Sequence, residues 1–217
     1  MLELLQYDFF TNALLAALLS SVSCGIIGTY IVSRRMVFIG GGITHASFGG
    51  IGIAYYLGMN PIVGAAVFAV LSALGINYFS QNGNIRQDSS IAIWWSLGMA
   101  IGIVFIAITP GYSPNLMSFL FGSILTVTFA DLAYMAVLSV ILVILFSFFF
   151  RVIVMIAFDE EFARARNLPV SFFNYTLMAL MALVIVASIR ISGVILVLSL
   201  LTLPQATANL FTKDFRS

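Results

Sequence analysis

The single histidine of the chain, His45, is the side chain best suited to chemistry, and it lies in the run GGGITHASFGG between Gly40 and Gly50. An imidazole can bind a transition metal or carry a proton. The run belongs to an apolar segment long enough to cross a membrane, where an ionisable residue is a functional candidate by default. Two interpretations are open. His45 lines a polar path as a ligand or proton carrier, or it hydrogen-bonds a carbonyl of an adjacent helix and locks packing.

Small residues surround His45 on the helix predicted from about residue 37. Gly41 and Gly49 lie one turn before and one turn after His45, which leaves space beside the ring. Ten residues separate His45 from Arg35, so a helical rise places the ring roughly 15 Å into the membrane, near its midplane. Four further small residues recur at every fourth position and form a ridge for close helix packing: Gly42, Ala46, Gly50 and Ala54.

One imidazole cannot hold a metal ion alone, since zinc usually takes four ligands. Further ligands would have to come from other spans, from carbonyls, from water or from a second copy of the chain. The lone Cys24 excludes a disulfide framework and a CxxC metal motif, and we expect it to be a small residue that faces lipid or another helix. The spans contain no paired carboxylates, HExxH-like site or nucleophile with a base, so an intramembrane enzyme is not expected.

Composition identifies a membrane protein. Of the 217 residues, 62% are hydrophobic and only 8% are charged, and the mean hydropathy is +1.13. A soluble domain carries about a quarter charged residues, so this chain has too few to cover a surface in water. The net charge of +1 gives no indication of nucleic acid, and we expect no nucleic-acid partner.

Long, continuous apolar runs predict helices, because backbone polar groups in lipid must be satisfied within the segment. We expect one transmembrane domain over residues 1–217, an all-α polytopic bundle of about seven spans. Residues Thr109–Asp131 open with prolines and a glycine before a short apolar run, which predicts an external loop and a short re-entrant or interfacial helix. The spans run roughly over 10–33, 37–58, 61–79, 91–109, 131–150, 171–190 and 193–211.

Basic residues orient the predicted spans. Every Lys and Arg except Arg190 falls in the loops after the first, third, fifth and seventh spans. The positive-inside rule makes that side cytoplasmic and places the N-terminus of this multi-pass protein outside. At the outer face, Asp131 either caps the fifth span or attracts cations into a vestibule, and Arg190 snorkels or contacts a delivery protein. Trp94 and Trp95 suit the interfacial aromatic belt at the cytoplasmic end of the fourth span.

The run FDEEFARARNLPV, Phe158–Val170, is a charged island on the cytoplasmic side. Its acidic residues precede its arginines, which matches the dipole of a short helix that starts near Asp159. Asn167 suits the left-handed position after the helix, and Pro169 prevents continuation. An exposed phenylalanine among charges suits a protein contact, and an ordinary charged loop is the alternative.

Four blocks of sequence resemble, in the same order and spacing, the membrane subunits of bacterial zinc/manganese ABC importers: RRMVFIGGGITHASFGGIGIAYYLG, LMSFLFGSILTV, FDEEFARARNLPV and SGVILVLSLLTLPQATANLF. The resemblance extends over nearly the whole chain. It implies an all-helical permease of the bacterial cytoplasmic membrane that dimerises, binds two cytoplasmic ATPase subunits and receives its ion from an external metal-binding protein. The chain has no P-loop pattern GxxxxGK[ST], so we expect no enzyme here and ATP hydrolysis by a separate subunit.

The resemblance also assigns roles to residues. By position it implies that the charged island is a coupling helix that docks on the ATPase through Glu161, Phe162, Ala163 and Arg164. Many members carry an aspartate four residues before the histidine, where this chain has Gly41, so the Asp/His pair is incomplete. Members usually continue beyond the point where this chain ends in LFTKDFRS, and we therefore expect a C-terminally truncated sequence.

The predicted function is import of a divalent transition-metal ion, zinc first and then manganese or iron. The ion is cargo, Zn²⁺ or Mn²⁺, and no permanently bound cofactor is expected. The expected partners are the ATP-binding subunit, a second permease copy, the external binding protein and membrane lipid. Two alternatives remain open: a permease of the same architecture for a metal chelate such as a siderophore or corrinoid, and an ion channel or carrier without a motor.

Overall fold

A computed structural model describes residues 7–83, 85–110 and 121–211 of the chain. The regular structure of this part is helical, with no strand in it, and the all-α prediction is confirmed. The elements are α1 (Asp8–Ser33), α2 (Phe38–Tyr56), α3 (Pro61–Asn82), α4 (Gln87–Ile108), the 3-10 turn η2 (Ile124–Thr126), α6 (Phe129–Phe158), α7 (Glu160–Ala165) and α8 (Val170–Phe211).

Five of the described helices are long and apolar enough to cross a membrane: α1, α3, α4, α6 and α8. Helix α2 is not among them, because its glycines, Thr44 and His45 reduce its mean hydropathy. Its 19 residues still extend about 28 Å, close to the thickness of the hydrocarbon core. The expectation of about seven spans is thus supported only in part, and the count stays a prediction.

The last two predicted spans form a single element, α8, which changes direction at Gly193. A straight helix of 42 residues would measure roughly 63 Å, about twice the hydrocarbon thickness. Gly193 leaves the helical conformation with φ 77° and ψ 165°, a backbone that glycine adopts without the steric cost of a side chain. The sequence prediction of a boundary near residue 192 therefore corresponds to an interruption within one element.

The segment before α6, predicted to lie outside, is described only from residue 121. The expected external loop and re-entrant helix fall partly on residues 111–120, outside the described residues. The described remainder contains the 3-10 turn η2, and the re-entrant helix stays a prediction. Gly122 has a left-handed φ of 62°, and a Cβ at this position would overlap the peptide between Ser192 and Gly193. A glycine of this segment therefore lies against the interruption of α8.

Packing divides the chain into two compact units. One contains α1, η2, α6, α7 and α8 from Ala187 onward; the other contains α2, α3, α4 and Ser171–Val186 of α8. The prediction of a single transmembrane domain is not tested by this division and stays a prediction.

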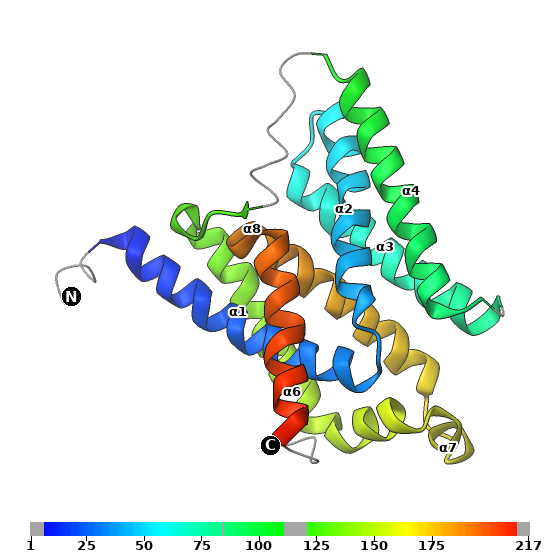
Figure 1. Cartoon of the computed structure of the whole chain (residues 1–217). Helices are drawn as coiled ribbons and strands as arrows, with labels where there is room; N and C mark the ends of the chain where they lie inside the picture. Colours follow the sequence, from blue (N-terminus) through cyan, green and yellow to red (C-terminus); the bar gives the residue numbers. More distant parts are fainter. Residues whose placement is uncertain (1–6, 84, 111–120, 212–217) are drawn as a thin grey trace. The chain divides into compact units, whose positions relative to one another are not determined.

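Helix α2 packs closely against both α3 and α4 in the second unit (Figure 1). A Cβ at Gly50 would overlap the carbonyl oxygen of Gly64 in α3. A Cβ at Gly98 of α4 would lie only 2.5 Å from the Cα and carbonyl oxygen of Ala46. Glycines at these crossings let the backbones approach in a way that a larger residue would prevent.

Small polar groups link the apolar helices of the first unit. The hydroxyl oxygens of Ser23 in α1 and Ser139 in α6 are 2.7 Å apart. The Gln205 amide nitrogen of α8 donates to the Cys24 carbonyl at 3.2 Å, and the Cys24 sulfur lies 3.6 Å from the Ser188 hydroxyl. Cys24 is buried and faces other helices, which is one of the two expected environments, the other being lipid.

Candidate functional site

His45 lies in the middle of α2 and contacts α4 through an aromatic stack. Its ring is parallel to that of Trp95, with centroids 4.4 Å apart and an interplanar angle of 8°. Phe48, in the same helix, stacks less closely at 6.1 Å. The sequence places Trp95 in an interfacial belt, whereas the structure brings it onto the imidazole. The periodicity of one helix does not reveal which residue of another helix it meets.

The imidazole of His45 is half-buried, and its Nδ1 atom is buried without a hydrogen-bond partner among the described residues. Buried polar atoms of native proteins nearly always have a partner, and an exception requires an explanation such as an ion or water. The interpretation of His45 as a purely structural residue needs a hydrogen bond to a neighbouring carbonyl. No such bond from His45 occurs within the described part of the chain, so the packing interpretation lacks the hydrogen bond that it requires there.

The residues one turn before and after His45 are small, but neighbouring helices fill the space beside them. Gly41, one turn earlier, is buried. At Gly49, one turn later, a Cβ would lie 2.8 Å from the Phe68 ring and 3.0 Å from the Gly98 carbonyl oxygen. The space predicted beside Gly49 is therefore filled by α3 and α4.

The ridge of small residues divides between two neighbours. A Cβ at Gly42 would overlap the Ile91 side chain of α4, and Ala46 meets Gly98 of the same helix. Gly50 and Ala54 instead meet Gly64 of α3. No group of three or more His, Cys, Asp or Glu side chains gathers into a metal site within the residues that the structure describes. The role of His45 as a metal ligand therefore stays a prediction.

The charged island forms α7, and the prediction of a short capped helix is confirmed. The Asp159 carboxylate accepts a hydrogen bond from the Phe162 amide at 2.8 Å, and Asn167 has the left-handed φ of 56°. Ala163 is completely buried, whereas the Phe162 side chain is 46% exposed. The exposed residues of α7 are therefore Glu161, Phe162, Arg164 and Ala165, and Ala163 faces inward.

Sequence reasoning missed an ion-pair network that holds α7. Glu160 accepts from Arg164 at 2.8 Å and from Arg34, at the end of α1, at 3.2 Å. Arg34 and Glu160 are 126 positions apart in the chain. The only signal available to the sequence is that both belong to the side predicted as cytoplasmic.

Asp131 has partners at the start of α6. Thr128 and Asp131 form a capping box, in which the Thr128 amide donates to the Asp131 carboxylate at 3.0 Å. The other carboxylate oxygen lies 2.9 Å from the Arg190 guanidinium. Asp131 thus takes part in the cap as its third helical residue, while Thr128 is the N-cap, and Arg190, the one basic residue that departs from the charge rule, pairs with this carboxylate. A vestibule role for Asp131 stays a prediction.

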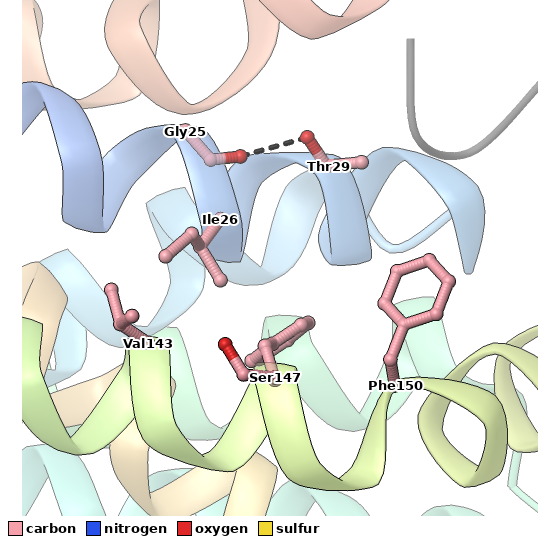
Figure 2. A pocket seen from close by; sticks show the side chains of 7 residues that line it. Gly25, Ile26, Thr29, Val143, Ser147 and Phe150 are labelled. Atoms are coloured by element: carbon pink, nitrogen blue, oxygen red, sulfur yellow. Dashed lines mark hydrogen bonds between the residues drawn. The ribbon is translucent and has the colours of Figure 1, made fainter.

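An apolar groove of about 450 Å³ lies between α1 and α6 (Figure 2). The Thr29 hydroxyl on its wall donates to the Gly25 carbonyl of its own helix at 2.7 Å. The remaining lining residues are Ile26, Val143, Phe146, Ser147 and Phe150. None of these side chains is titratable, so the groove offers no ligand set for a metal ion.

Together, the long apolar helices and the capped polar helix after α6 are features of a multi-pass membrane protein of the permease type. Residues 6–217 match the ABC 3 transport family, and the chain belongs to this family. Members of the family are the membrane subunits of transporters, and the ATPase is a separate subunit. The expectation that this chain is not the ATPase is confirmed.

Several known proteins are similar to the chain over nearly its whole length. An uncharacterized membrane protein of Synechocystis is 44% identical over 99% of this chain and 76% of the relative. The manganese transport system membrane protein MntC of Halalkalibacterium halodurans is 37% identical over 97% of this chain and 72% of the relative. The solved structure of PsaBC from Streptococcus pneumoniae in complex with a Fab matches with a TM-score of 0.82 and 34% identity, over 99% of this chain and 78% of that one.

Proposed function

We propose that this chain is the multi-pass permease of an ATP-driven importer of a divalent transition-metal ion, with manganese as the first candidate. Family membership, together with an intramembrane imidazole whose Nδ1 makes no hydrogen bond to the described residues, carries the proposal. The name of the MntC relative supports manganese ahead of zinc. This reverses the order of metals that the sequence predicts.

His45 lines the metal path in this proposal and acts as a transient ligand. A neutral imidazole binds divalent transition-metal ions, and for manganese, which favours oxygen ligands, carbonyls and water would complete the site. The absence of a carboxylate at Gly41 keeps the site sparse. A sparse site suits transport, because an ion must leave as readily as it enters. The packed residues Gly42, Ala46, Gly49 and Gly50 hold the neighbouring backbones in place around it.

Helix α7 is the surface on which the ATP-binding subunit docks. Its exposed residues Glu161, Phe162 and Arg164 offer both charges and an aromatic ring, and contact residues of this kind are typical of protein interfaces. The loop arginines assign this end to the cytoplasm and the N-terminus to the outside. An external metal-binding protein and a second permease copy complete the importer.

Metal uptake by the assembled importer tests the metal path. We expect His45→Ala to abolish or sharply reduce manganese uptake at unchanged expression, because it removes the only imidazole of the chain. Ser47→Ala is the matched control, since the Ser47 hydroxyl is buried in the same helix and donates only to the Thr44 carbonyl. Parental uptake of manganese, zinc and iron by His45→Ala would refute the path.

Two further arms of the uptake assay separate the alternatives. Transport of a siderophore or corrinoid complex in place of the free ion would favour the chelate permease. Uptake without the ATP-binding subunit would favour a channel or carrier.

Charge reversal on α7 tests the docking surface. We expect Arg164→Glu and Glu161→Arg each to lower metal-stimulated ATP hydrolysis by the complex while the permease stays folded. Normal coupled hydrolysis in both variants would remove α7 from the interface.

A further inference from the structure

Arg34 joins three helices at the end of the chain's first long helix. It follows the last residue of α1, and its guanidinium reaches two different acceptors. One terminal nitrogen donates to the Ile156 carbonyl near the end of α6 at 3.0 Å, and the other lies 3.2 Å from the Glu160 carboxylate of α7. A guanidinium has the fixed fork of donors that such a double contact requires, whereas a lysine has a single ammonium group.

The Glu160 carboxylate is held from two sides. One oxygen contacts Arg34 and the other accepts from Arg164 at 2.8 Å. The side chains of Arg34 and Glu160 are 17% and 28% exposed, so water screens this pair less than it screens the open pair of Arg86 and Asp88. The position of α7 is therefore coupled to the end of α1 by directional, charge-assisted hydrogen bonds.

The covalent connection of α7 does not by itself fix its position. Asp159 alone separates α6 from α7, and its extended backbone, φ −148° and ψ 92°, interrupts the helix. A rigid short helix attached through one extended residue can pivot about that residue. Arg34 restricts this freedom beyond the packing of the buried Ala163, because it binds α6 before the interruption and α7 after it.

We propose that Arg34 is a positioning residue that transmits movement of α7 to α1 through Glu160. The proposal rests on the assignment of α7 as the docking surface of the ATP-binding subunit. When that subunit moves α7, the Arg34–Glu160 pair carries the movement to the cytoplasmic end of α1. Without the pair, α7 pivots about Asp159 and the transmembrane helices respond weakly.

The test uses the complete importer with its ATP-binding subunit and compares Arg34→Met, Glu160→Gln and the double variant. The main measurement is the ratio of metal-stimulated to basal ATP hydrolysis. We expect each single variant to lower this ratio roughly five-fold or more, the range of ordinary allosteric couplings. The double variant should lose less than the sum of the two single losses, because both changes break the shared Arg34–Glu160 link.

Arg86→Met is the matched control, since it removes the same charge from an arginine whose side chain is 86% exposed. It should retain the parental ratio. Thermal midpoints of all variants are measured in parallel, and Arg34→Lys, which keeps the charge without the double contact, should give an intermediate ratio. A parental ratio in Arg34→Met, or full additivity in the double variant, overturns the proposal.

A cross-link from Glu161→Cys to the ATP-binding subunit distinguishes this failure from failure of the docking assignment. If the cross-link forms in both the parental and the Arg34→Met background while the ratio falls only in the latter, docking and transmission are both supported. If the cross-link never forms, α7 is not the docking surface, and the transmission proposal falls with it. If it forms and Arg34→Met keeps the parental ratio, docking stands and only transmission is refuted.

Discussion

Gly50→Ala tests the contact between α2 and α3 at its tightest point. A Cβ at residue 50 would overlap the Gly64 carbonyl oxygen and lie 2.5 Å from the Gly64 carbonyl carbon and 2.7 Å from the Phe68 Cβ, whereas ordinary van der Waals contact begins at 3.4 Å. Two of these atoms belong to the backbone, so rotation of a side chain cannot relieve the overlap. The helices must separate locally by about 1 Å, and contacts along their interface weaken.

The expected loss of stability follows from two opposing effects. Overpacking a close-packed interior costs about 1–3 kcal/mol, while exchange of a mid-helix glycine for alanine gains about 0.5–1 kcal/mol. The free energy of unfolding should therefore fall by up to about 2.5 kcal/mol. For a chain of this length that lowers the thermal midpoint by up to about 10 °C.

The assay is thermal unfolding in detergent, followed by tryptophan fluorescence, because both tryptophans lie in the same unit as the substitution. Gly25→Ala in α1 is the matched control, since no heavy atom lies within 4 Å of a Cβ built there. It should leave the midpoint unchanged or raise it slightly. A midpoint for Gly50→Ala at or above that of Gly25→Ala would refute the close approach of α2 and α3.

Three further predictions concern the polar groups of the membrane region. Gly41→Asp should tighten manganese binding and slow its release, because it places a carboxylate one helical turn before His45; unchanged affinity in a metal-competition titration would contradict this. Trp95→Ala should lower manganese uptake by removing the ring stacked on His45, whereas Trp95→Phe should retain most of it; equal uptake by the two variants would show that the stack has no role. Asp131→Asn should lower the free energy of unfolding by about 1 kcal/mol, and with it the thermal midpoint, because it weakens the capping box and the ion pair with Arg190. Full additivity with Arg190→Gln would argue against the pairing.

Local features of the chain could be predicted from the sequence because their causes lie within a few neighbouring residues. The first span, expected over 10–33, corresponds to Asp8–Ser33. The short helix after α6 starts beside Asp159 and ends before a left-handed Asn167, as its capping residues predict. The predicted start of the fifth span, residue 131, is less accurate. Helix α6 begins at Phe129, because its N-cap is Thr128 and not Asp131.

The sequence by itself therefore determines the helical class, the apolar spans and the isolated imidazole. These features follow from the transfer of apolar side chains into lipid and from neighbouring residues, neither of which requires knowledge of the fold. The partners of the polar groups are decided by tertiary structure. Trp95 meets His45, Arg190 meets Asp131 and Arg34 meets Glu160 only because particular helix faces turn toward one another. The 3.6-residue period defines the faces of each helix. Which faces meet depends on packing between helices, and here glycines such as Gly50 and Gly98 decide how closely and where α2 can approach its neighbours.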